Sequence, residues 1–289
     1  MAMKCMWNQF YKELPDDWTI PVSYLSVSRR KGGRISISDQ TYEQLMFAGR
    51  HCIDPIPELE NPKQLYYANK LNFQTPPNKD MATLTWRYKD ALKYDDMWTY
   101  VPTLRRTIRM VSSERANPIR GSAYTWDDIF GFDGKIPLFS YKLLGEQTVL
   151  NLQNQKLLAE EMDRKNYPHH PILHHNEEYE TVPCYLIEIT PKDTRYPSSK
   201  KVVWLGKGNF KVTYAEIYDK TGNFWKGYYN ASQRRSFPTK HGIEPYPITS
   251  GSGMTDFKTF YWTYTCTGGL VMNGGPDPSY FSPGAMGTF

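Results

Sequence analysis

The histidines form the group of side chains that most resembles a metal-binding cluster. Four of the six histidines lie within the seven residues from His169 to His175, and Glu177 follows closely. Neutral imidazoles and carboxylates are common metal ligands. However, Pro168 and Pro171 interrupt the segment, so it does not form a helix that would align these side chains on one face. We therefore expect an exposed loop here and no functional metal site.

Other residue patterns that carry catalysis are weak in this sequence. Asp127 and Asp128 are adjacent, so on a helical turn their carboxylates point about 100° apart and do not converge on one substrate atom. The stretch Gly251-Ser-Gly253 lacks the spacing of a nucleophile elbow, and Gly206-Lys-Gly208 is not a phosphate-binding loop. We predict no catalytic residues and no cofactor, although a triad assembled only in space leaves no such pattern.

The densest group of charged and aromatic residues runs from residue 95 to residue 131. A strand pattern is followed by Arg105 and Arg106, and Asp127 and Asp128 come about twenty residues later. Arginine binds carboxylates through two parallel hydrogen bonds, and a partly buried pair of this kind fixes a connection in place. We predict that one of the two arginines contacts one of the two aspartates, and that these ion pairs are structural.

β-Strands must position these residues, because alternation with a period of two recurs along the chain while helical periodicity is scarce. In several segments large aromatic side chains alternate with Thr, Lys or Arg. The aromatic residues that we predict to share one apolar, ligand-binding face are Trp86, Tyr88, Trp98, Tyr100, Tyr214 and Tyr218. Such a pattern is typical of a curved sheet whose apolar face lines a cavity, and equally of one whose rings fill a core.

A few further elements are predicted locally. Residues 182–230 predict a meander of four antiparallel strands. Short helices are predicted from Asp39 to Ala48 and from Gln153 to Arg164, and a single helical turn from Trp126 to Phe130. Pro-rich stretches predict loops at residues 54–62, 75–77, 191–197 and 276–283.

Composition argues against several classes of protein. The formal charge of the 289 residues is only +5, and the basic residues form short scattered clusters, so we predict no nucleic-acid partner. The four cysteines form no C-x-x-C pair and are expected to be scattered buried thiols, although disulfide pairing stays open. No apolar run is long enough for a transmembrane helix, and residues 1–10 lack the apolar region of a signal peptide.

Three motifs in order resemble the bacterial domain-of-unknown-function family numbered 1329. Residues 97–109 are similar to the family's W-x-Y-x-P-x-x-R-R-x-x-R stretch, and residues 126–131 lie where the family has an acidic turn. Residues 202–225 are similar to its late hairpin, which usually reads Y-D-x-x-G-x-L-W. The resemblance covers about residues 7 to 265. Ala123 departs from it, because the family is expected to have an acid there.

The resemblance implies a fold like that of the lipoprotein carriers LolA and LolB. That fold is a strongly curved, incomplete β-barrel with helices on its concave side, and in the carriers the concavity holds acyl chains. The resemblance also implies export to the periplasm. Family members usually extend further before a Trp-Asn motif, here Trp7-Asn8, so we expect this chain to lack an export signal and part of the N-terminal region.

We therefore predict one all-β domain over residues 1–289, a half-barrel of about ten strands with few short helices. The tail at residues 266–289 is rich in Gly and Pro, and none of the three motifs places a counterpart for it in the family. The predicted function is non-catalytic binding or transfer of a lipid-like or other apolar ligand in the periplasm of a Gram-negative envelope. Its expected partners are that ligand and an envelope membrane protein. The alternatives are a structural or interaction module of an envelope assembly, with a filled concavity, and an envelope hydrolase.

Overall fold

The computed structural model describes residues 1–11, 15–28, 34–119, 122–156, 177–267 and 270–287. Within these residues lie one α-helix, α1 (Ala2–Phe10), and fourteen strands. The strands are β1 (Asp17–Ser28), β2 (Arg34–Met46), β3 (Leu65–Phe73), β4 (Ala82–Tyr88), β5 (Asp96–Val101), β6 (Arg106–Met110), β7 (Phe139–Asn151), β8 (Glu180–Pro191), β9 (Lys200–Gly206), β10 (Val212–Tyr218), β11 (Phe224–Thr239), β12 (Gly242–Asp256), β13 (Tyr261–Thr267) and β14 (Val271–Met272). Short 3-10 helices connect them: η2 (Pro102–Leu104), η3 (Ser112–Ala116), η4 (Trp126–Gly131), η5 (Ile136–Leu138), η7 (Pro278–Phe281) and η8 (Pro283–Ala285). None of the described helices is both long and apolar enough to span a bilayer.

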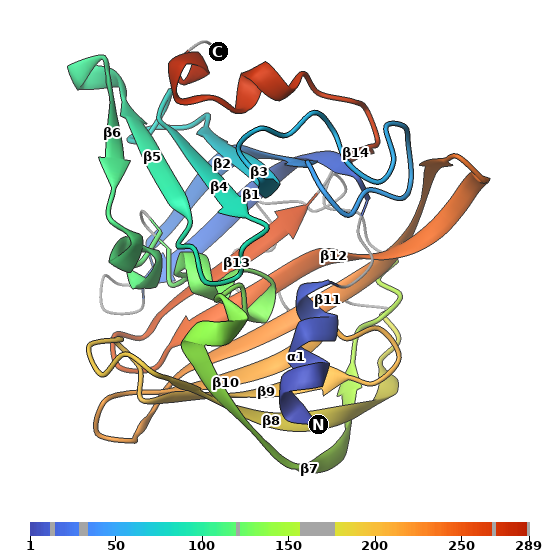
Figure 1. The fold of residues 1–289 in the computed structure, drawn as a ribbon. Helices are drawn as coiled ribbons and strands as arrows, with labels where there is room; N and C mark the ends of the chain where they lie inside the picture. The colour runs from blue at the N-terminus through green and yellow to red at the C-terminus, as the bar shows by residue number, and fades with distance from the viewer. Residues whose placement is uncertain (12–14, 29–33, 120–121, 157–176, 268–269, 288–289) are drawn as a thin grey trace.

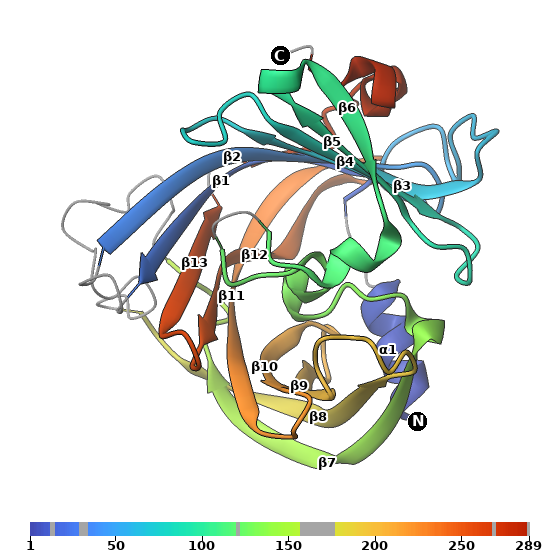
Figure 2. The ribbon, with the colours of Figure 1, turned by 90° about the vertical axis from the view of Figure 1, so that its left-hand side faces the viewer.

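The strands form a single antiparallel sheet that curls without closing. Their order is β6-β5-β4-β3-β2-β1-β13-β12-β11-β10-β9-β8-β7, and β14 pairs with β1. Because β6 and β7 stand at opposite ends of this order, the described strands leave the barrel incomplete (Figures 1 and 2). The predicted half-barrel is confirmed, although the sheet has fourteen strands rather than about ten.

Cross-strand register defines the two faces of the sheet. Trp18, Gln44, Asn69, Thr85 and Met97 pair in turn across β1 to β5, and directly paired residues point to the same side of a sheet. This row points into the curve. The alternate residues of the same strands point outward, because successive side chains of a strand lie on opposite faces.

The inside of the curve is occupied by α1 and by a segment that we call the plug, residues 111–119 and 122–138. Figure 2 shows both within the curve, with α1 close to β7. The helix buries one face, on which Ala2, Cys5 and Met6 lie at helical spacing. Its apolar side chains and those of the plug pack with inward residues of the sheet in the main hydrophobic core.

The outside of β3 to β5 is covered by residues 277–287, the C-terminal segment (Figure 1). Phe281 packs in a second apolar cluster with Trp86, whose Nε1 donates a hydrogen bond to the Phe281 carbonyl at 2.7 Å. Gly287 has a φ of +93° and runs so close to Tyr100 that a Cβ atom would lie 2.7 Å from its ring. As a result, every residue of β4 is buried, although Ala82, Leu84, Trp86 and Tyr88 point outward.

The local predictions have mixed outcomes. The meander is confirmed as β8 to β11, and the helical turn at Trp126 is confirmed as η4. The helix predicted from Asp39 to Ala48 is wrong, because this segment lies largely in β2, hydrogen-bonded to β1 on one side and β3 on the other. Pairing along both edges outweighs a weak helical preference. The sequence did not indicate α1.

Two further predictions fall on residues that the structure does not describe. The histidine loop at residues 169–175 lies wholly outside the described residues, and the helix predicted from Gln153 to Arg164 lies largely outside them. Three of the cysteines, Cys5, Cys52 and Cys184, are buried free thiols.

Candidate functional site

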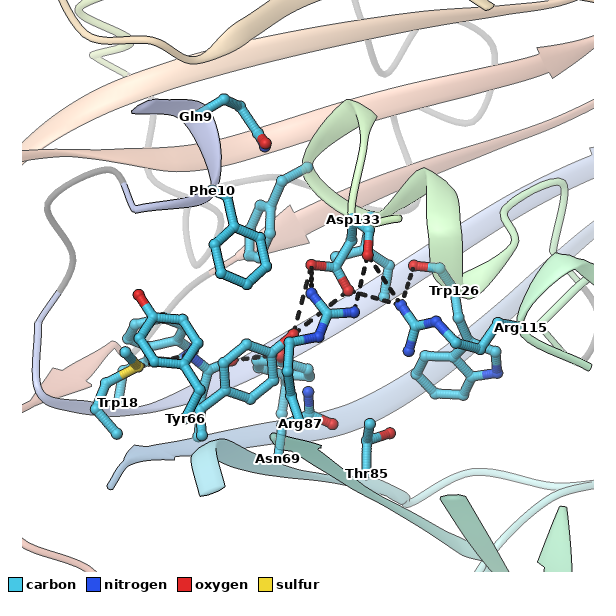
Figure 3. A pocket seen from close by; sticks show the side chains of 16 residues that line it. Gln9, Phe10, Trp18, Tyr66, Asn69, Thr85, Arg87, Arg115, Trp126 and Asp133 are labelled. Atoms are coloured by element: carbon cyan, nitrogen blue, oxygen red, sulfur yellow. Dashed lines mark hydrogen bonds and ion pairs between the residues drawn. The ribbon is translucent and has the colours of Figure 1, made fainter. Parts of the chain in front are cut away.

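A cluster of buried charges joins the plug to the inside of the sheet (Figure 3). At its centre is Arg87 of β4, whose side chain is fully buried. Its Nε and Nη2 donate hydrogen bonds to the Asp95 carboxylate, at distances between 2.8 and 3.3 Å. Nη1 donates to the Asp133 carboxylate at 2.7 Å, and Nη2 to the Asp133 carbonyl at 2.8 Å. Arg87 therefore binds the β4–β5 connection and the plug at the same time.

Arg115 of η3 supplies the second guanidinium. Its Nε donates to Asp127 at 2.9 Å and its Nη2 to Asp133 at 2.8 Å, while Nη1 lies 3.2 Å from Asp95. Lys135 Nζ lies 3.4 Å from the other oxygen of Asp95. Three cations and three carboxylates thus neutralise one another. This matching offsets the cost of taking so many charges out of water.

A second charged contact forms around Asp128 of η4. Lys201 of β9 donates from Nζ to its Oδ1 at 2.8 Å, and the Thr125 hydroxyl donates to its Oδ2 at 2.8 Å. On the neighbouring side, Lys226 of β11 donates to the Ala123 carbonyl at 2.9 Å. Three separate strands, β4, β9 and β11, therefore each direct one buried cation at the plug.

These contacts hold two carboxyl groups in the ionised form. Burial by itself raises the pKa of Asp95, but Arg87 and Arg115 lower it by more, so that the net pKa lies below its ordinary value. Burial also raises the pKa of Asp128, and Lys201 reverses this effect to leave the pKa lowered. A general acid must hold a proton near working pH, so neither carboxyl is suited to that role. The cluster is a structural clamp on the plug.

The charge cluster borders a small central cavity of about 40 Å³, which Figure 3 shows from close by. Arg87, Asn69 and Thr85 approach it from the sheet, and Gln9 and Phe10 from α1. About 10–15 Å³ of such space is needed per water molecule, so the cavity accommodates a few waters and no lipid chain.

A much larger cavity, of about 360 Å³, lies between the plug and the strands β4 to β6. Its apolar walls are formed by Phe73, Val101, Ile108, Met110, Ile119 and Trp126. Polar groups enter from Thr83, Thr99, Arg109, Glu114 and Asn117. The Ile108 side chain is 46% exposed on the end strand β6, so the cavity opens to solvent beside that strand. We call it the β6 cavity.

A third cavity, of about 60 Å³, lies near β1 and β12 and is mostly apolar, with walls that include Ile20, Ile248 and Met272. It shares Trp18 and Phe130 with the central cavity, and the central cavity shares Trp126 with the β6 cavity. Aromatic side chains thus separate three cavities on the concave side. Two of these separating residues belong to η4, the element that the buried cations hold in place.

One group of residues in the described chain has the composition of a metal site. Ligand atoms of Asp16, His51 and Cys52 lie within 4.8 Å of one another. However, the Asp16 carboxylate already accepts hydrogen bonds from the backbone N–H groups of residues 51, 52 and 53, at 2.8–2.9 Å. Arg50 Nη2 lies 4.0 Å away, which disfavours a second cation. We interpret this arrangement as a loop clamp.

Four of the predicted binding-face aromatics come together, but on the outside of the curve. Trp86, Tyr88, Trp98 and Tyr100 pack in the cluster covered by the C-terminal segment, where the Trp86 and Trp98 ring centroids are 4.7 Å apart. The predicted location on the concave face is therefore corrected. The residues that alternate with these rings point inward, where the charge of Arg87 is compensated by Asp133 of the plug.

The other two predicted aromatics lie apart from this group. Tyr214 and Tyr218 belong to β10, in which the alternate residues Ala215 and Ile217 face the main core. Both tyrosines consequently point outward. The Tyr214 hydroxyl donates to the Leu150 carbonyl, and the Tyr218 hydroxyl donates within its own strand, so neither ring reaches a cavity described above.

The predicted ion pairs are also corrected. Asp127 and Asp128 are buried and paired, but their partners are Arg115 and Lys201. Arg105 and Arg106 are exposed, in the turn between β5 and β6 and at the start of β6. The chain reverses after β6, and η3 therefore brings Arg115 to the aspartates while the β5–β6 turn stays at the rim.

Sequence reasoning did not identify Arg87, Asp95, Arg115 or Lys201 as members of a charge cluster. Arg87 stands between Trp86 and Tyr88, and Lys201 follows Lys200 at the start of a strand; both patterns are also typical of solvent-facing side chains. The sequence contained one weak signal, the adjacent carboxylates of Asp127 and Asp128 at the start of a predicted helical turn. If that turn is buried, both carboxylates need buried cations as partners.

Comparison with known proteins gives one family match. Residues 1–286 match the family described as "Protein of unknown function (DUF1329)". The match extends beyond residues 7 to 265 and includes most of the tail at residues 266–289, for which the three motifs placed no counterpart. No curated protein matches the chain.

Several solved structures have the same fold. An outer membrane lipoprotein-sorting protein domain from Vibrio parahaemolyticus has 17% identity and a TM-score of 0.69, over 99% of this chain and 98% of that chain. A DUF1329 family protein from Desulfovibrio piger ATCC 29098 has 17% identity and a TM-score of 0.68, over 98% and 97% of the two chains. A LolA superfamily protein from Nitrosomonas europaea has 12% identity and a TM-score of 0.56, over 98% of each chain. The family match and the shared fold confirm the resemblance seen in the three motifs, and the chain belongs to the DUF1329 family, with a LolA-like incomplete barrel.

Proposed function

We propose that this protein binds and carries an apolar, lipid-like molecule in the periplasm of a Gram-negative envelope, without catalysing a reaction. The β6 cavity is the observation that carries the proposal. Its volume of about 360 Å³ is in the range of small-molecule sites, and its walls combine apolar side chains with a few polar groups. Each methylene group that leaves water for such a site contributes about 0.8 kcal/mol.

The fold supports the same proposal. The lipoprotein-sorting domain and the LolA superfamily protein share the incomplete barrel, and the β6 cavity lies on its concave side. Access is direct, because the cavity opens beside a sheet edge and needs no rearrangement of the buried charge cluster.

The alternative proposal is a structural or interaction module. The observation in its favour is the plug itself, which fills most of the concavity and is fixed there by Arg87, Lys201 and Lys226. A module of this kind needs no ligand, so the two proposals differ in whether the isolated protein binds an apolar molecule.

A fluorescence titration separates them. The neutral apolar fluorophore N-phenylnaphthylamine is titrated into the intact protein, Val101→Trp and Val111→Trp. Val101 is a partly buried wall residue, and a Trp there fills the cavity, whereas Val111 is 63% exposed and is not part of its wall. We expect micromolar binding by the intact protein and Val111→Trp, and at least about tenfold weaker binding by Val101→Trp. Absence of binding by the intact protein favours the module.

A further inference from the structure

We propose that the mouth of the β6 cavity is a site for an anionic headgroup, formed by Arg105 and Arg106, and that the ligand is an anionic amphiphile. This inference rests on the proposed function and specifies the ligand class. It concerns the two arginines that the buried charge cluster does not use.

Strand register places Arg106 beside the cavity. Arg106 pairs with Val101, Ile108 with Thr99, and these four residues share the inward face of the β5–β6 hairpin. Val101, Thr99 and Ile108 all line the cavity. Alternate residues of a strand are about 7 Å apart, which is within the reach of an extended arginine side chain. The Arg106 guanidinium can therefore meet a headgroup whose chain lies against Ile108.

The two guanidinium groups have no carboxylate partner within the described part of the chain. Among the described residues, no acidic oxygen lies within 4.0 Å of Arg105 or Arg106, whereas Arg109 of the same strand is paired with Asp96. Arg105 also ends η2 with a φ of +49°, a left-handed conformation that is uncommon outside glycine. Arg106 thus presents an exposed positive charge beside the cavity, and Arg105 adds a second one in the adjoining turn. Neither charge is paired with a carboxylate that the structure describes.

The two ends of the cavity differ in charge. Glu114 also lines the cavity and follows the Met110 end of β6 in the chain, whereas Arg106 begins β6. The other charged lining residue, Arg109, is paired with Asp96. An anion is attracted to the β5–β6 turn and repelled by Glu114, while an apolar chain fits between Ile108 and Met110. The charge distribution therefore orients an anionic amphiphile with its headgroup toward Arg105 and Arg106.

Guanidinium groups bind carboxylates and phosphates alike, through paired hydrogen bonds. A fatty acid and a phosphorylated lipid consequently offer the same recognition chemistry. Three ligands with the same chain length separate the contribution of the headgroup to binding from that of the apolar chain: tetradecanoate, tetradecyl phosphate and tetradecanol. Each ligand is titrated as a competitor of bound N-phenylnaphthylamine. The titrations use the intact protein, the Arg105→Gln/Arg106→Gln variant, and a matched Arg234→Gln/Arg235→Gln control on β11.

We expect the intact protein and the control to bind at least one of the two anions about tenfold or more tightly than tetradecanol. In Arg105→Gln/Arg106→Gln that preference should fall to within about twofold, with tetradecanol binding unchanged. Preference for the carboxylate or for the phosphate identifies the headgroup, and both outcomes support the inference. Equal binding of all three ligands by the intact protein overturns the headgroup site but leaves the proposed function standing. Failure of all three to displace the fluorophore overturns both.

Discussion

The Arg115 guanidinium donates from Nε to the Asp127 carboxylate at 2.9 Å, and this contact closes the plug on itself. The two residues are twelve positions apart, one on η3 and the other on η4. The same guanidinium reaches Asp133 and Asp95, so the plug is tied to itself and to the β4–β5 connection through one side chain. Ile119 and Trp126 of this segment bound the β6 cavity, so these contacts help to hold one of its walls in place.

The first prediction concerns this contact. Replacement of Arg115 by Met, or of Asp127 by Asn, should each lower the free energy of unfolding by about 3–5 kcal/mol, because each leaves the buried cluster with one unbalanced charge. The loss in the free energy of unfolding for the double variant should be smaller than the sum of the two single losses, by about 0.5–3 kcal/mol. Urea unfolding followed by tryptophan fluorescence measures all three values.

The matched control is Arg105→Gln/Arg106→Gln, whose side chains are exposed. It should change the free energy of unfolding by no more than about 0.5 kcal/mol. Strictly additive costs in the Arg115 and Asp127 cycle would show that the two groups do not interact.

The second prediction concerns acid stability. The pKa of Asp95 and of Asp128 is lowered in the folded protein, by Arg87 and by Lys201 among other groups, against the opposing effect of burial. Both carboxyls therefore stabilise the fold fully above their unfolded pKa of about 3.9. This stabilisation is lost as the pH falls from that value toward the lowered folded pKa.

Urea unfolding between about pH 6 and pH 3 tests the acid dependence. Asp128→Asn should be less stable at the upper end of this range and should show a shallower loss toward the lower end. Replacement of the exposed Glu60 by Gln provides the control and should leave the slope unchanged. A wild-type stability that is flat across the range would falsify the assignment.

The third prediction concerns the C-terminal segment. Phe281→Ala removes a side chain that is 2% exposed and packs against Trp86. We expect a loss of about 3–5 kcal/mol in the free energy of unfolding, because a large buried ring leaves a cavity behind. The exposed Ile243→Ala serves as the control, with an expected change within about 0.5 kcal/mol. A loss for Phe281→Ala as small as that of the control would mean that the segment is not part of the folded core.

Period-two alternation predicted part of the sheet. The alternation that includes Trp86 and Tyr88 lies in β4, and the meander predicted over residues 182–230 is β8 to β11. These patterns are local, since they depend only on neighbouring residues in the same strand. The open barrel followed from the family resemblance, because no local pattern specifies how far a sheet curls.

The faces of the sheet were harder to predict than the strands. Placing Trp86 inside and Arg87 outside is the ordinary expectation, and here the reverse holds. The reason is that both faces of β4 are covered, one by the C-terminal segment and the other by the charged plug. Partners more than forty residues away decide which face is which: Phe281 for Trp86, and Asp133 for Arg87.

Photo-crosslinking tests the central claim, that an apolar ligand occupies the β6 cavity, most directly. The intact protein is irradiated with a fatty acid that carries a diazirine near the end of its chain, and the labelled peptides are identified by mass spectrometry. We predict labels on the segment from Arg106 to Ile119, which contains Ile108 and Met110, and loss of these labels in excess tetradecanoate. Labels confined to the outward cluster around Trp98, or no label that tetradecanoate competes away, would contradict the claim.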